Sequence, residues 1–234
     1  MNCREPDHFT DNHDRTMDHE GIRPLRYLHI ALVLCTAHFV TAQTTDTAQV
    51  IIYRSLDAAL RDPDHVYRLD LGNSGLKEFP MEVLKFRNLR ELSLRQDSIR
   101  TLPEEIGLLR NLRVLDLGGN PISLLPEHFG DLVALEELTL SDDRSLSLEL
   151  DIEILSRLPK LRILHLEHDH LGLLPRNIDR LSALEELYLN DNDLRALPPT
   201  IQGLQHLKLL DLRGNPIDPL IPLDLQQRGV LIRF

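Results

Sequence analysis

A segment of 23 residues recurs along most of this chain. Seven repeats can be aligned, and their starts are separated by 23, 23, 23, 26, 23 and 23 residues: Val66, Leu89, Leu112, Leu135, Leu161, Leu184 and Leu207. Leucine occupies the fourth and the sixth position of every repeat. A period of this length is typical of a solenoid, in which each repeat forms one coil that buries its apolar residues only against neighbouring coils. The chain is therefore predicted to fold as a stack of coils.

The spacing within a repeat predicts its local structure. Leucines two residues apart point to one face of a strand, and the polar residues between them point to the other. An asparagine follows the strand at Asn120, Asn192 and Asn215, where its amide can bond backbone groups that the turn leaves unpaired. A Leu-Pro or Phe-Pro pair comes next in five repeats, and proline suits the first position of a short helical turn. The five pairs are Phe79-Pro80, Leu102-Pro103, Leu125-Pro126, Leu174-Pro175 and Leu197-Pro198.

Some repeats depart from this pattern. The turn asparagine is replaced at Ser74, Asp97, Asp143 and Asp169. An ionised carboxylate cannot donate a hydrogen bond, so the aspartate turns should be satisfied differently. The fourth repeat is three residues longer than the others and has Glu149 in place of proline, which we interpret as a bulged outer loop or turn.

The residues that carry this pattern resemble the leucine-rich repeat family, in particular its short Leu-Pro class found in bacterial proteins and Ras-group scaffolds. The resemblance covers residues 66 to about 220. It implies an α/β solenoid shaped as a curved horseshoe, with a concave parallel sheet and short helical turns on the convex side. It also implies binding of protein partners on the concave sheet.

The chain is expected to divide into four parts. Residues 1–42 form a leader, and residues 43–65 form an N-terminal capping segment with a short helix capped by Ser55. Residues 66–229 form the seven repeats, and residues 230–234 form a C-terminal edge strand.

The leader resembles a secretory signal. Residues 27–40 read YLHIALVLCTAHFV, with Arg23 and Arg26 before them and small residues suited to cleavage after Ala42 behind them. The apolar run is shorter than the roughly 20 residues that span a membrane, so no stable span is expected in the mature protein. Residues 1–20 carry six acids and two arginines, which is unusual for a signal unless translation begins at Met17. Export is the expectation, and a buried or interfacial segment in a cytoplasmic protein is the alternative.

Composition limits the partners and the chemistry. The formal net charge is −11 and the sequence shows no basic stripe, so a nucleic acid is not expected as a partner. Both cysteines, Cys3 and Cys35, lie before residue 42, so a cleaved protein could form no disulfide. No phosphate loop, GxSxG elbow, HExxH helix or EF-hand loop is present. We therefore expect no catalytic residues and no cofactor.

The polar residues of the strands should lie on the concave face. Acids outnumber bases there by nine to three: Asp70, Glu91, Asp116, Glu137, Asp142, Glu167, Glu186, Asp191 and Asp211 against Arg68, Arg95 and Arg213. Such a surface would attract a basic partner and accelerate encounter. The alternative is that these residues only keep the strand face hydrophilic.

A local cluster in the fifth repeat is the candidate binding site. Residues 165–170 read His-Leu-Glu-His-Asp-His, and Tyr188 is the only aromatic residue on the predicted concave columns. An aromatic residue beside an apolar neighbour within a charged rim is a typical binding hot spot. The candidate residues are Ile163, His165, Glu167, Tyr188, Glu137, Glu186, Asp116 and Arg95. Imidazole and carboxylate also suit zinc, but the turn histidines His168 and His170 should point away from His165, so no metal site is predicted.

These observations favour a non-enzymatic module that binds a protein or peptide of basic character. A structural repeat protein of the cell surface that associates with itself is one alternative. A metal-dependent enzyme centred on His165 and Glu167 is another, although an open sheet excludes water poorly and so favours neither acid nor base catalysis. The sequence does not determine the oligomeric state.

Overall fold

The computed structural model describes residues 51–142, 147–218 and 223–234. The chain divides into two compact units, 1–46 and 47–234, and all described residues belong to the second. The predicted leader and the turn residue Asp143 lie outside the described residues.

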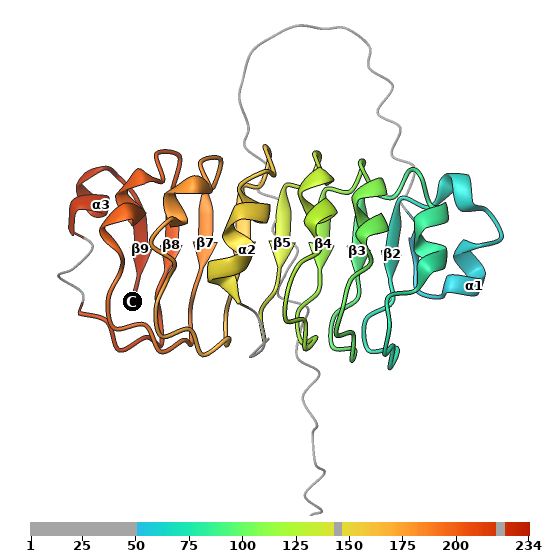
Figure 1. Ribbon diagram of the computed structural model, residues 1–234, viewed down its shortest axis with the longest axis horizontal. Helices are drawn as coiled ribbons and strands as arrows, with labels where there is room; N and C mark the ends of the chain where they lie inside the picture. The colour runs from blue at the N-terminus through green and yellow to red at the C-terminus, as the bar shows by residue number, and fades with distance from the viewer. Residues whose placement is uncertain (1–50, 143–146, 219–222) are drawn as a thin grey trace, which may run out of the picture. The chain divides into compact units, whose positions relative to one another are not determined.

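In the described part of the chain, nine short parallel strands lie side by side in chain order and form one open sheet (Figure 1). They are β1 (Ile52–Tyr53), β2 (Arg68–Asp70), β3 (Glu91–Ser93), β4 (Val114–Asp116), β5 (Glu137–Thr139), β6 (Ile163–His165), β7 (Glu186–Tyr188), β8 (Leu209–Asp211) and β9 (Leu231–Arg233). The fourth-position leucines are paired from strand to strand, as in Leu138, Leu164 and Leu187. The predicted α/β solenoid is therefore confirmed. Strand β9 lies within residues 230–234, where an edge strand was expected, whereas β1 was not predicted.

Short helical segments cover one face of the sheet (Figure 1). They are α1 (Leu56–Ala59), η1 (Pro63–His65), η2 (Met81–Lys85), η3 (Glu104–Leu108), η4 (Glu127–Asp131), α2 (Leu148–Leu155), η5 (Ile178–Arg180), η6 (Pro199–Gly203) and α3 (Leu223–Gln227), where η denotes a 3-10 helix. The predicted cap of α1 is confirmed, because the Ser55 side chain accepts a hydrogen bond from the Ala58 amide.

The Leu-Pro prolines take a position one residue earlier than predicted in four of the five repeats. Pro80, Pro103, Pro126 and Pro198 are the N-caps of η2, η3, η4 and η6 rather than their first helical residues. In all five repeats the proline carbonyl accepts a hydrogen bond from the amide three residues later, at Val83, Ile106, Phe129, Ile178 and Ile201. These five residues are buried, so the proline turn directs the next apolar side chain into the core.

The core runs continuously through the stack. Leucine at the fourth and sixth positions is buried in all seven repeats. These leucines pack with the inward residues of the helical segments into one apolar cluster. Each coil is therefore stabilised by its two neighbours, as stacking requires.

Asparagine in the turn links neighbouring coils. The Asn120 amide donates to the carbonyls of Leu94 and Leu117 and accepts from the Ile99 amide, at 2.7, 2.8 and 3.0 Å. Asp97 replaces asparagine one coil earlier, and its Oδ1 accepts from the Leu76 amide at 3.0 Å. The buried Oδ2 of Asp97 has no hydrogen-bond partner among the described residues. The expectation that a carboxylate satisfies this turn differently is confirmed.

The longer fourth repeat contains a regular helix, so the predicted bulged loop was wrong. The two-turn helix α2 occupies the place where other repeats have a 3-10 turn. Ile152 and Leu155 of this helix are buried in the core. Asp151 is buried on the same helix and accepts a hydrogen bond from the Leu125 amide of the preceding coil. Within the described ranges, no helix is long and apolar enough to cross a membrane.

Candidate functional site

The candidate site lies on the face of the sheet opposite the helical layer, hereafter the sheet face. This face carries the third, fifth and seventh positions of the repeats, and all eight predicted residues occupy those positions. Strand register places Ile163 of β6 between Glu137 of β5 and Glu186 of β7. It also pairs His165 with Tyr188. The structure therefore brings these five residues together, while Asp116 on β4 and Arg95 after β3 lie on coils further along the sheet.

His165 is the centre of a buried polar network. Its Nδ1 lies 3.1 Å from a Glu167 carboxylate oxygen, and its Nε2 lies 3.4 Å from a Glu137 carboxylate oxygen. A neutral imidazole has one N–H, so only the imidazolium can donate to both carboxylates. Burial lowers the pKa of His165, but the hydrogen bonds to Glu137 and Glu167 outweigh it and raise the pKa to about 9. His165 is therefore a buried cation at neutral pH.

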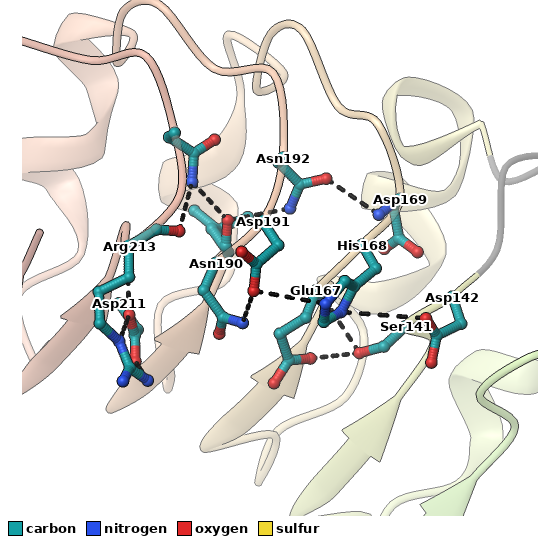
Figure 2. A network of polar contacts seen from close by, with 12 residues as sticks. Ser141, Asp142, Glu167, His168, Asp169, Asn190, Asp191, Asn192, Asp211 and Arg213 are labelled. Atoms are coloured by element: carbon teal, nitrogen blue, oxygen red, sulfur yellow. Dashed lines mark hydrogen bonds and ion pairs between the residues drawn. The ribbon is translucent and has the colours of Figure 1, made fainter. Parts of the chain in front are cut away.

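Glu167 is fixed from two sides. The Ser141 hydroxyl of the preceding coil donates to its carboxylate and accepts from its backbone amide (Figure 2). Burial raises the pKa of Glu167, but the hydrogen bond and the charge of His165 outweigh that effect and lower it. His165 and Glu167 are only 5% and 4% exposed, so in this structure they lie beneath the surface that a partner would meet. Their pairing in a buried ion pair allows both charges to be removed from solvent.

Tyr188 forms the surface above this network. Its ring stacks on the His165 ring, with centroids 4.5 Å apart and planes 8° from parallel. Its hydroxyl donates to the Glu186 carboxylate at 2.7 Å. Burial and this hydrogen bond to a carboxylate raise the pKa of Tyr188. The ring remains partly exposed, so Tyr188 is a rigidly held aromatic side chain at the sheet face.

The buried carboxylate of Asp211 forms a second ion pair, with the more exposed Arg213. The carboxylate accepts two hydrogen bonds from the Arg213 guanidinium, at 2.9 and 2.7 Å (Figure 2). Arg233 of β9 lies 3.5 Å from the same carboxylate. Burial raises the pKa of Asp211, but the Arg213 hydrogen bonds outweigh it and lower the pKa. Arg233 was not predicted because it follows the last repeat, although extending the repeat register by one strand would place it opposite Asp211.

The acidic excess of the sheet face is smaller than the sequence suggests. Arg68 neutralises Glu91 at 2.7 Å, and the His165 and Asp211 networks neutralise further carboxylates. Asp116 is held by the Gly118 amide at 3.0 Å, and burial raises its pKa. The acids around the Tyr188 ring that keep partial exposure are Glu137 and Glu186. One imidazolium lies between Glu137 and Glu167, so this group keeps one net negative charge beside that of Glu186.

The turn histidines lie outside the buried network. His168 is exposed between Asp142 and Asp191, 3.9 and 3.3 Å away (Figure 2). His170 lies 3.2 Å from Asp193. Both histidines have positive φ, and His168 lies at the eighth position, which has positive φ in all seven repeats. Among the described residues, no group of three or more His, Cys, Asp and Glu is arranged to hold a metal ion.

Comparison with known families shows which repeat this is. The leucine rich repeat model matches residues 64–122, 87–144 and 159–217, which together cover more than half of the chain. Repeats of this family typically act as protein-binding modules without enzymatic activity of their own. A search of curated proteins finds no match.

Several solved structures are similar to this chain. The leucine-rich repeat domain of the type III effector XopL has 28% identity and a TM-score of 0.56, over 68% of this chain and 57% of that one. TLR13, in a complex with ssRNA13, has 26% identity and a TM-score of 0.55, over 68% of this chain and 24% of that one.

An internalin, InlF from Listeria monocytogenes, shares the fold at 22% identity and a TM-score of 0.50, over 67% of this chain and 50% of that one. The chain thus spans little more than half, or less, of the length of these proteins. The strand register, the asparagine turns and the family match agree, and this chain is a member of the leucine-rich repeat family.

Proposed function

We propose that the chain is a non-enzymatic module that binds a protein or peptide on its sheet face, with Tyr188 as the central anchor. The observation that carries this proposal is the stacking of Tyr188 on the buried His165 ring. A ring held by stacking and by its hydroxyl loses little conformational entropy when a partner covers it. Rigid, partly exposed aromatic residues near the centre of an interface contribute a large share of binding energy.

The surroundings of Tyr188 favour a partner with basic side chains. Glu137 and Glu186 flank the aliphatic Ile163, so a lysine or arginine stem could pack on Ile163 while its charge meets a carboxylate. TLR13 is a structural relative that was solved with RNA. We nevertheless expect no nucleic acid on this face, because Glu137 and Glu186 would repel phosphates.

Export through the N-terminal leader is part of this proposal. The basic residues, the short apolar run and the small residues before Gln43 support secretion and a cell-surface, periplasmic or extracellular location.

Quantitative affinity purification from the native host tests the function. Wild-type protein, Tyr188→Ala and the helical-layer control Glu104→Lys serve as baits in parallel. We expect the same proteins to be enriched by wild type and Glu104→Lys and to be depleted with Tyr188→Ala. The binding free energy of a recovered partner should be about 2 kcal/mol less favourable for Tyr188→Ala than for wild type. If Glu104→Lys abolishes capture while Tyr188→Ala retains it, the proposal is wrong.

Electrostatic steering is tested separately with Asp142→Asn combined with Asp191→Asn. Both side chains are more than half exposed, so their neutralisation should leave the fold intact. We expect a slower association rate with the recovered partner and a smaller dependence of that rate on salt. Glu137 is unsuitable for this test because it bonds His165, so its substitution would also alter the buried network.

A further inference from the structure

Four exposed arginines cluster at the edge of the solenoid where strands β3 and β4 begin. Arg90 and Arg113 occupy the second position of their repeats, one residue before the strands. Arg87 and Arg110 occupy the turns that lead into those strands, and all four are exposed. The four arginines, hereafter the arginine edge, lie outside the columns of the sheet face.

Backbone bonds place these arginines side by side. The Arg113 amide donates to the Arg90 carbonyl at 2.7 Å, so the two residues are neighbours on adjacent coils. The Asn111 side chain donates to the Arg87 carbonyl at 2.9 Å and fixes the turn that carries Arg110 against the turn that carries Arg87. The coils are about 4.8 Å apart, so two pairs of guanidinium groups share a small surface.

These charges are not balanced within the described ranges of the chain. None of the four arginines forms an ion pair there. The Arg90 guanidinium lies over the Tyr67 ring, 5.2 Å from its centroid. The same column is balanced in later repeats, where Arg162 and Lys208 alternate with acids. Arg162 pairs with Glu136 at 2.9 Å and Lys208 with Glu185 at 2.7 Å.

The second repeat position carries like charges at Arg90 and Arg113 but alternating charges in the later repeats, so Arg90 and Arg113 do not stabilise the stack as Arg162 and Lys208 do. Like charges opposite one another on adjacent strands destabilise a sheet, whereas alternating charges stabilise it. Four unbalanced arginines are also unexpected in a chain with a net charge of −11. Guanidinium groups bind carboxylates in a bidentate geometry, which makes such a cluster suited to an acidic ligand.

We propose that the arginine edge binds an acidic segment of a partner protein, at a surface separate from the sheet face. The cluster extends over only two coils. In the preceding coil, Asp64 occupies the position equivalent to Arg87 and Arg110, and in the following coil Glu136 occupies the position equivalent to Arg90 and Arg113. Exposed Leu108 and Val133 lie beside Arg110, in its own turn and in the next coil, and offer apolar contacts to a peptide. A nucleic acid would need a longer basic stripe. A membrane surface would bring its anionic headgroups against the flanking acids.

Fluorescence anisotropy with a labelled probe peptide, Glu-Glu-Leu-Glu-Glu-Leu-Glu-Glu, tests the proposal. The edge variant replaces the four arginines with glutamine: Arg87→Gln, Arg90→Gln, Arg110→Gln and Arg113→Gln. The matched control makes the same change of charge at four other exposed arginines: Arg157→Gln, Arg176→Gln, Arg180→Gln and Arg195→Gln. Circular dichroism melting verifies that each variant is folded. If the edge variant is unfolded, a double variant with Arg90→Gln and Arg113→Gln takes its place.

We expect wild type and the control to bind the peptide with an affinity that falls as salt rises. The edge variant should bind at least tenfold more weakly, and Tyr188→Ala should bind as wild type does, which separates this surface from the proposed sheet-face site. Equal affinity of the edge variant and the control overturns the proposal. Tighter, edge-dependent binding of wild type to an eight-residue oligothymidylate or to phosphatidylserine vesicles overturns it as well, in favour of a nucleic acid or a membrane.

Discussion

The buried imidazolium of His165 predicts a loss of stability at alkaline pH. Its pKa is about 9 in the folded chain against 6.5 for the unperturbed group. The folded state therefore holds a proton that the unfolded state has released between these two values. A tenfold difference in proton affinity is worth about 1.4 kcal/mol, so protonated His165 contributes about 3 kcal/mol to folding. This contribution is complete below pH 6.5 and is lost as the pH rises through 9.

Urea unfolding from pH 6 to pH 10 measures this effect. The free energy of unfolding should fall by up to about 1.4 kcal/mol per pH unit between pH 6.5 and 9. Asp151 does not contribute in this range, because burial raises its pKa only to about 6. Hydrogen bonds to Asp62 and Asp131 raise the pKa values of the exposed His65 and His128 as well, but this effect is the same in wild type and in a variant of His165.

His165→Gln is the matched variant, since glutamine is polar and cannot take up a proton. At pH 7 it should be less stable by about 3–5 kcal/mol, because Glu137 and Glu167 lose the charge between them. Its stability should change much less than that of wild type from pH 6.5 to 9. If the two proteins show parallel pH profiles in this range, His165 is not charged in the folded chain and the reasoning fails.

Three further outcomes are expected. Leu164→Ala should cost about 2–5 kcal/mol in denaturant melts, whereas Leu69→Ala should cost less because an end coil can fray; equal losses would contradict a one-dimensional stack. Asp97→Asn should raise the free energy of unfolding by about 1 kcal/mol, because the amide gains donors that the carboxylate lacks, and a destabilised variant would contradict this account of the turn. Mass spectrometry of protein from the native host should find Gln43 as the first residue, and an intact residue 1 or 17 on most of the protein would refute export by cleavage.

The repeat made the fold predictable from the sequence. Each coil buries the same leucines against its neighbours, so the 23-residue period determines the strand order and register together. This reasoning placed Leu164 opposite Leu138 and Leu187, as the structure confirms. It failed in the coil that departs from the period, where the eight-residue helix α2 takes the place of a short 3-10 turn.

The site was less predictable than the fold. The sequence identified Tyr188, but it did not reveal that His165 and Glu167 are buried, since their burial depends on contacts with Ser141 and Glu137 of the preceding coil. The arginine edge was also missed. Its members are dispersed in the sequence, and the signal that could have found them is the recurrence of arginine 23 residues apart in adjacent coils.

Site-specific photo-crosslinking tests most directly whether the sheet face binds the partner. A benzophenone amino acid replaces Asn190, which is partly exposed beside Tyr188, or Glu105, which is exposed on the helical layer. The binding model predicts that the Asn190 probe crosslinks the partner recovered by affinity purification and that the Glu105 probe does not. The Tyr188→Ala substitution should abolish the Asn190 crosslink. Crosslinking from Glu105 alone, or a crosslink from Asn190 that Tyr188→Ala leaves unchanged, would contradict binding through the Tyr188 surface.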